Sequence, residues 1–111
     1  MNYHNKRFRV VESTANAETT EETIFAYQQT ENIITSEYKG GNILKGHLIG
    51  LVDKDGSIDM RYHQVNLEGE LMTGICHSTP ELNKNGKIRL HERWKWTSGD
   101  MSSGKSILEE L

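Results

Sequence analysis

Glu92 stands in line with two tryptophans, an arrangement that would place a carboxyl group beside aromatic rings. Residues 87–96, KIRLHERWKW, separate by alternation into two rows. One row holds five basic side chains, and the other consists of Ile88, Leu90, Glu92, Trp94 and Trp96. Successive side chains of a β-strand point to opposite faces, so the basic row indicates the face in contact with water. Glu92 is therefore expected to point into the interior.

A carboxylate in an apolar interior is costly unless it is paired or hydrogen-bonded, and two arrangements would satisfy it. In a structural network, Glu92 contacts Tyr62, Gln64 or an arginine that reaches in near the rim. In a binding site, Glu92 anchors a small ligand between aromatic walls. The predicted ligand-binding residues are Tyr62, Gln64, Glu92, Trp94 and Trp96.

Four histidines, at positions 47, 63, 77 and 91, recur at intervals of 16, 14 and 14 residues. Hairpins centred near residues 55 and 84 would place His47 opposite His63 and His77 close to His91, all on the outer face. Paired imidazoles can bind a metal ion, but neighbouring arginines would repel a cation. A solvated outer face is the expectation, and no metal site is predicted.

Three further motifs have structural interpretations. Cys76 is the one cysteine and is expected to be a buried thiol that is not a nucleophile. DKDG at 53–56 begins like a calcium loop, but Gln64 occupies the twelfth position, where the loop needs a glutamate. GDMSSGKS at 99–106 matches the phosphate-loop pattern, yet only ILEEL follows it, which is too short for the required helix. We expect turns at both places.

Turn-forming clusters divide the chain at regular intervals. KGGN, DKDGS, NLEGE, NKNGK and SGDMSSG contain the Gly, Asn and Asp residues that tight hairpins favour. The intervening segments are rich in strand-forming residues, and STANAETTEE at 13–22 is expected to be a polar loop with at most a helical turn. The expected strands are 6–12, 23–29, 33–38, 43–52, 57–65, 71–78, 87–96 and 105–111. An eight-stranded antiparallel meander that closes into an up-and-down barrel, an all-β fold, is predicted.

Alternation also predicts the inner rows of three other strands. The expected inner residues of 43–52 are Leu44, Gly46, Leu48, Gly50 and Val52, with Lys45 and His47 outside. Strand 57–65 places Ile58, Met60, Tyr62 and Gln64 inside and Ser57, Asp59, Arg61 and His63 outside. Met72, Gly74 and Cys76 form the inner row of 71–78. Inner glycines allow a strand to bend or leave room above it.

Composition limits the classes of function. The chain of 111 residues is expected to form one domain, 1–111, and its net charge of −3 argues against a nucleic-acid binder. The single cysteine excludes an internal disulfide, and no apolar run reaches the length that spans a bilayer. The N-terminus lacks the apolar segment of a signal peptide. We expect a cytoplasmic protein without a membrane partner or a cofactor.

Residues 47–82, together with GKIRLHERWKWTSGD and SSGKSILEE, resemble a family of small bacterial proteins that often carry the label "N-acetylglutamate synthase". The similarity covers roughly residues 25–110 and includes the paired tryptophans and the terminal acidic pair. It implies a compact β-barrel of lipocalin-like or avidin-like type, and its label implies acetyl transfer to glutamate.

The chain's own residues favour a different activity. Acetyl-CoA binding needs a helix N-terminus for the pyrophosphate, and no helix of useful length is expected. The leading hypothesis is therefore a non-enzymatic barrel that binds a small molecule in its lumen, or one whose site has degenerated. The alternatives are an acetyltransferase and a self-associating structural module with a filled interior. The ligand and the oligomeric state stay open.

Overall fold

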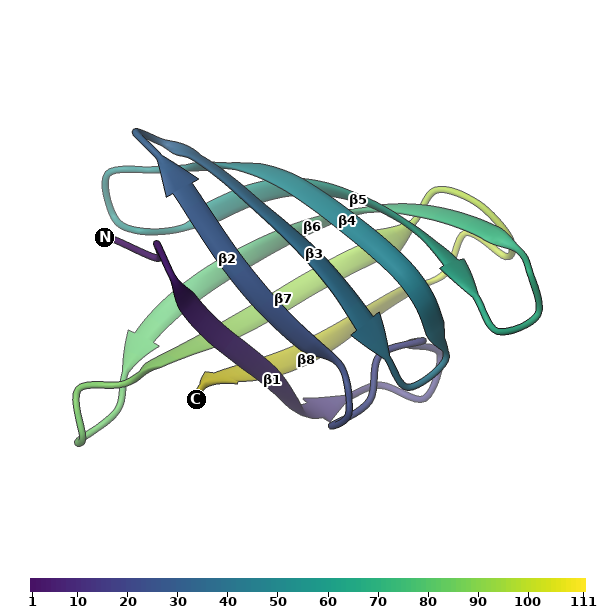
Figure 1. Ribbon diagram of the computed structural model, residues 1–111, viewed down its shortest axis with the longest axis horizontal. Coiled ribbons are helices and arrows are strands. Elements are labelled where there is room, and N and C mark those ends of the chain that lie inside the picture. The colour runs from purple at the N-terminus through teal and green to yellow at the C-terminus, as the bar shows by residue number, and fades with distance from the viewer.

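The computed structural model describes residues 1–111 and shows eight antiparallel strands that close into a barrel in sequential order (Figure 1). The last strand pairs with the first, so no sheet edge is left unpaired. The strands are β1 (Lys6–Ser13), β2 (Ile24–Thr30), β3 (Ile33–Gly40), β4 (Ile43–Val52), β5 (Ile58–Asn66), β6 (Leu71–Leu82), β7 (Ile88–Trp96) and β8 (Ser103–Glu110). The predicted all-β meander barrel is confirmed.

Most strand boundaries agree with the expectation, and the largest difference is in β6. This strand continues to Leu82, because residues 79–82 pair with residues 88–91 of β7. Strand β8 begins earlier than expected, at Ser103, which pairs with Lys95. The Gly-Lys-Ser sequence therefore lies within a strand, which excludes a phosphate loop. Residues 14–23 contain turns and no helical turn. No helix in the structure has the length and apolar character needed to cross a bilayer.

One type of turn connects three of the hairpins. DKDGS, NLEGE and NKNGK each place a glycine at the fourth position, with φ angles of 88°, 81° and 77° at Gly56, Gly69 and Gly86. These angles are unfavourable for residues with a Cβ atom. In each turn the N–H of this glycine donates to the carbonyl three residues earlier. The sequence signal for these hairpins is thus a backbone requirement of the turn.

Three inner glycines make room for aromatic rings on the neighbouring strand. Tyr38 pairs with Gly46, Tyr62 pairs with Gly74, and Trp94 pairs with Gly104. A Cβ atom at any of these glycines would overlap the paired ring. The rings therefore lie across the glycine backbone, and the expectation that inner glycines leave room is confirmed.

The inner rows follow the predicted alternation, with two corrections. Leu44 was expected inside, but a β-bulge between Ile43 and Lys45 adds a residue to β4 and leaves Leu44 55% exposed. Ile43 takes the inner position in its place. Ser57 was expected outside, but it lies just before β5 and is buried. The inner row of β7 is as predicted, with all five residues buried.

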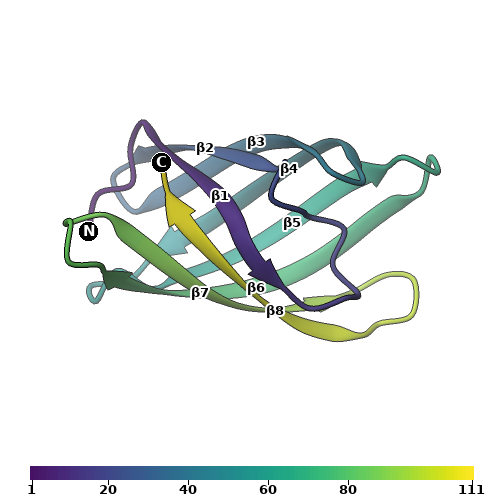
Figure 2. The ribbon, with the colours of Figure 1, turned by 90° about the horizontal axis from the view of Figure 1, so that it is seen from below.

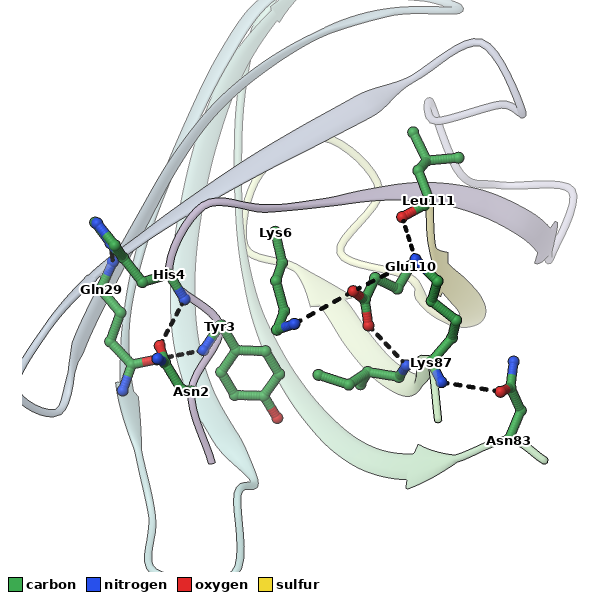
Figure 3. A network of polar contacts seen from close by, with 10 residues as sticks. Asn2, Tyr3, His4, Lys6, Gln29, Asn83, Lys87, Glu110 and Leu111 are labelled. Atoms are coloured by element: carbon green, nitrogen blue, oxygen red, sulfur yellow. Dashed lines mark hydrogen bonds and ion pairs between the residues drawn. The ribbon is translucent and has the colours of Figure 1, made fainter. Parts of the chain in front are cut away.

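The N-terminal residues close one end of the barrel. Tyr3 is fully buried, its ring packs against Phe8 and Tyr27, and its N–H donates to Gln29 Oε1 at 2.8 Å. Figure 3 shows Tyr3 at this end, near the contacts that join β1, β7 and β8. Glu110 accepts from Lys6 Nζ at 3.3 Å and from the backbone N–H of Ile88 at 3.0 Å. This end is therefore plugged.

The opposite end, which we call the mouth, is covered by the β1–β2 loop (residues 14–23). Figures 1 and 2 show this loop and the β7–β8 loop at the end away from both termini. Trp96 Nε1 donates to the carbonyl of Asn16 at 3.1 Å, and the Asn16 side chain donates to Ser102 Oγ at 2.9 Å. The N–H of Asn42 donates to the Glu18 carbonyl at 3.2 Å. The loop is thus attached to both sides of the mouth.

Candidate ligand site inside the barrel

A cavity of about 50 Å³ lies inside the barrel beneath the β1–β2 loop. This volume accommodates roughly four water-sized groups. All five predicted ligand-binding residues contribute to its wall. The lining consists of Val10, Ala17, Glu18, Thr19, Phe25, Tyr38, Leu48, Met60, Tyr62, Gln64, Cys76, Glu92, Trp94, Trp96 and Ser106.

Aromatic rings form much of the cavity wall. The Trp94 and Trp96 rings meet edge to face with centroids 5.6 Å apart, and Tyr62 meets Trp96 at 5.7 Å. On the opposite side, Phe25 and Tyr38 pack at 4.6 Å. Trp94 Nε1 donates to Ser106 Oγ at 2.9 Å, which satisfies the indole N–H inside the protein. The wall is therefore apolar, with its polar atoms at a few fixed points.

Glu92 is 9% exposed and stands between two serines on the neighbouring strands. The pairing places Ser78 of β6 and Ser106 of β8 directly opposite it. Ser78 Oγ donates to Glu92 Oε2 at 2.7 Å, the one hydrogen bond that the carboxyl group makes. The expected partners were Tyr62, Gln64 or an arginine, and this expectation is wrong. The basic side chains of β7 point outward, so none can reach the carboxyl group.

Burial without a cationic partner raises the pKa of Glu92 from 4.5 to about 7, and the hydrogen bond from Ser78 only partly opposes this effect. Burial and the nearby Glu92 carboxyl group also raise the pKa of Tyr27, whose hydroxyl is buried and has no hydrogen-bond partner. Burial likewise raises the pKa of the Cys76 thiol, in agreement with the expected unreactive cysteine.

Gln64 connects the barrel wall to the β1–β2 loop. Its Oε1 accepts from the Tyr38 hydroxyl at 2.8 Å, and its Nε2 donates to Glu18 Oε1 at 2.8 Å. The other Glu18 oxygen accepts from Asn66 Nδ2 at 2.7 Å. Both oxygens of this second carboxylate therefore accept from amides, and no cation pairs with it.

Several residues of the site were not among those predicted. Ser78 and Ser106 could have been found by counting positions across the hairpins from Glu92. Tyr38 lies between Glu37 and Lys39, which is a weaker signal, and Phe25 lies between Ile24 and Ala26, so alternation does not identify it. Glu18 lies in a loop without a repeating pattern, so no local sequence signal places it over the mouth.

The outer histidines include one directly paired set, as expected. His47 lies opposite His63 with ring centroids 5.4 Å apart. His77 was expected close to His91; it lies opposite Arg93, two residues along β7 from His91, and His91 contacts Glu81 at 3.0 Å. No group of three or more His, Cys, Asp or Glu side chains could hold a metal ion.

An eight-stranded up-and-down barrel with an interior cavity at one end has the architecture of barrels that hold one small molecule. Comparison with known proteins agrees with this class. The family model described as "Avidin-like protein" matches residues 1–111, so the chain belongs to the avidin-like family. No curated protein and no solved structure matches the chain.

The family match corrects one expectation from the sequence. The resemblance to proteins labelled "N-acetylglutamate synthase" is wrong as an assignment, because the matching family is avidin-like over the whole chain and nothing found points to such a synthase. The avidin-like barrel that the resemblance implied is confirmed.

Proposed function

We propose that this protein binds a small molecule in the barrel interior and does not transform it. The observation that carries the proposal is the cavity under the β1–β2 loop, where aromatic rings surround a carboxyl group with one unpartnered oxygen. Apolar walls with a few oriented polar groups are typical of small-molecule sites. Membership of the avidin-like family supports the same function.

The chemistry around the cavity favours binding over catalysis. Ser78 and Glu92 are hydrogen-bonded, as a nucleophile and its base would be, but acyl transfer also needs free N–H groups that stabilise an oxyanion. The strands on both sides of Glu92 form continuous ladders with their neighbours. The buried Cys76 thiol has a raised pKa, so little thiolate is available for attack. The cavity also argues against the structural-module alternative, which expects a filled interior.

A screen of small molecules against thermal unfolding tests the proposal, because a ligand of the folded state raises the midpoint. The blocking variant is Ala17→Phe, in which the added ring points into the cavity from the loop. The matched control is Ala26→Phe on the exposed face of β2. We expect stabilising compounds to lose their effect in Ala17→Phe and keep it in Ala26→Phe. Equal responses in both variants would place binding outside the barrel and contradict the proposal.

A further inference from the structure

The cavity wall contains acidic side chains and no basic one. Two carboxyl groups, Glu18 at the mouth and Glu92 inside, contribute to the wall, and no Lys, Arg or His side chain does. None of the ion pairs in the structure involves either residue. A buried carboxylate is normally paired with a positive charge, and here the protein supplies none.

The Glu92 carboxyl group has one oxygen available to a ligand. Oε2 accepts the hydroxyl of Ser78 at 2.7 Å, and Oε1 makes no hydrogen bond with the protein. An N–H donor in the cavity would therefore meet an acceptor without a competing partner. If that donor were positively charged, it would also supply the missing counter-charge, and charge-assisted hydrogen bonds of this kind are the stronger ones.

The rest of the wall also suits a cation. Trp94, Trp96 and Tyr62 lie around the cavity, and the faces of such rings attract organic cations, most strongly when both are shielded from water. A neutral N–H donor would gain only an uncharged hydrogen bond from the Glu92 carboxyl group, and an anion would be repelled by it. Size matters as well, because about 50 Å³ admits only a small group of a few heavy atoms.

We propose that the barrel binds a small organic cation with N–H donors, of the guanidinium or ammonium class, with the charged nitrogen group against Glu92. The inference rests on the proposed function, because it names the class of ligand for the same cavity. It requires Glu92 to be ionised in the complex.

The titration of Glu92 should therefore appear in the binding curve. The titratable groups that its charge affects are Tyr27 of β2, Tyr38 of β3, Tyr62 of β5 and Cys76 of β6, and Glu18 of the loop lines the same cavity. Burial raises the pKa of the three tyrosines and of the cysteine, so these groups stay neutral near pH 7. The Glu92 carboxyl group, with a pKa of about 7, is then the group whose charge changes there.

Guanidinium, urea and acetate provide the test, because each is planar with four heavy atoms and they differ in charge. Each is titrated at constant ionic strength, at concentrations that do not unfold the protein. The chain contains two tryptophans, both in the cavity wall, so their two indole N–H signals in a nitrogen-15 NMR spectrum report on the site. We expect saturable shifts with guanidinium, at least tenfold tighter binding than urea, and no response to acetate.

Two measurements assign the preference to Glu92. In Glu92→Gln the preference for guanidinium over urea should fall below about threefold, whereas the exposed control Glu37→Gln should keep it. In the unmodified protein, guanidinium affinity should rise about tenfold from pH 6 to pH 8, as the ionised fraction of Glu92 increases. This second measurement tests the inference even if Glu92→Gln does not fold.

The outcomes separate the inference from the proposed function. The cation assignment would be overturned if urea or acetate bound as tightly as guanidinium, or if the preference persisted in Glu92→Gln. Either result would leave a barrel that binds another class of ligand. Guanidinium affinity that does not change with pH would also overturn this assignment. The absence of a saturable response to guanidinium would also overturn the cation assignment, and the proposed function would then be decided by the thermal-unfolding screen with Ala17→Phe and Ala26→Phe.

Discussion

Glu92→Gln should stabilise the protein in a pH-dependent way. The substitution preserves the shape of the side chain and an oxygen that can accept from Ser78, but it removes the possibility of a negative charge. Since no cation contacts Glu92, the substitution leaves no buried partner without its counter-charge. The usual large penalty for breaking a buried ion pair is therefore not expected.

The raised pKa gives the magnitude and the sign. Between pH 4.5 and about pH 7, the Glu92 carboxyl group is protonated in the folded state and ionised in the unfolded state. The free energy of unfolding of the unmodified protein therefore falls as pH rises through this range. Above this pH range, the ionised carboxyl group lowers the free energy of unfolding by about 3 kcal/mol, because each unit of pKa difference corresponds to about 1.4 kcal/mol. Glu92→Gln lacks this contribution, so the two proteins should be similar at pH 5 and the variant more stable at pH 8.5.

Urea unfolding followed by circular dichroism measures the difference, with both proteins examined at each pH. All other ionisable groups are common to both, so subtraction isolates Glu92. By thermal unfolding, about 3 kcal/mol corresponds to roughly 13 °C in the midpoint of a chain of this size. A variant that is less stable than the unmodified protein at pH 8.5 would show that the charged form has a partner, and the account of Glu92 given above would be wrong.

Two further substitutions test the packing of the site. Gly104→Ala should destabilise the protein by about 1–3 kcal/mol, since the new Cβ atom overlaps the Trp94 ring; urea unfolding should show a smaller cost in a Trp94→Phe background, and an equal cost would contradict this explanation. Glu18→Ala should detach the β1–β2 loop from Gln64 and Asn66, whose amide groups donate to the Glu18 carboxylate, and increase acrylamide quenching of the tryptophan fluorescence. Glu21→Ala, on an exposed part of the same loop, is the control, and similar quenching in the two variants would show that Glu18 does not hold the loop over the mouth.

The alternation of residues in the sequence determines much of this barrel. Burial of five side chains on β7 requires that its basic row face water, so the inward position of Glu92 follows from local chemistry alone. In three clusters, a glycine at the fourth position marks the hairpin, because the backbone there needs a positive φ angle. Sequential hairpins then lead to a closed meander. These features depend on neighbours in the chain, and they could be predicted.

Only the tertiary structure decided what surrounds Glu92. The extra residue at Leu44 shifts the register of β4, and such a bulge depends on pairing with β3 and β5 rather than on local sequence. Ser78 lies beside the carboxyl group because of the alignment of β6 with β7. Glu18 covers the mouth because its loop contacts strands distant in the chain. The cavity volume is the small difference between the volume of the barrel interior and the volume of the side chains that fill it. The cavity and its carboxyl group without a cationic partner therefore appear only once all eight strands are in place.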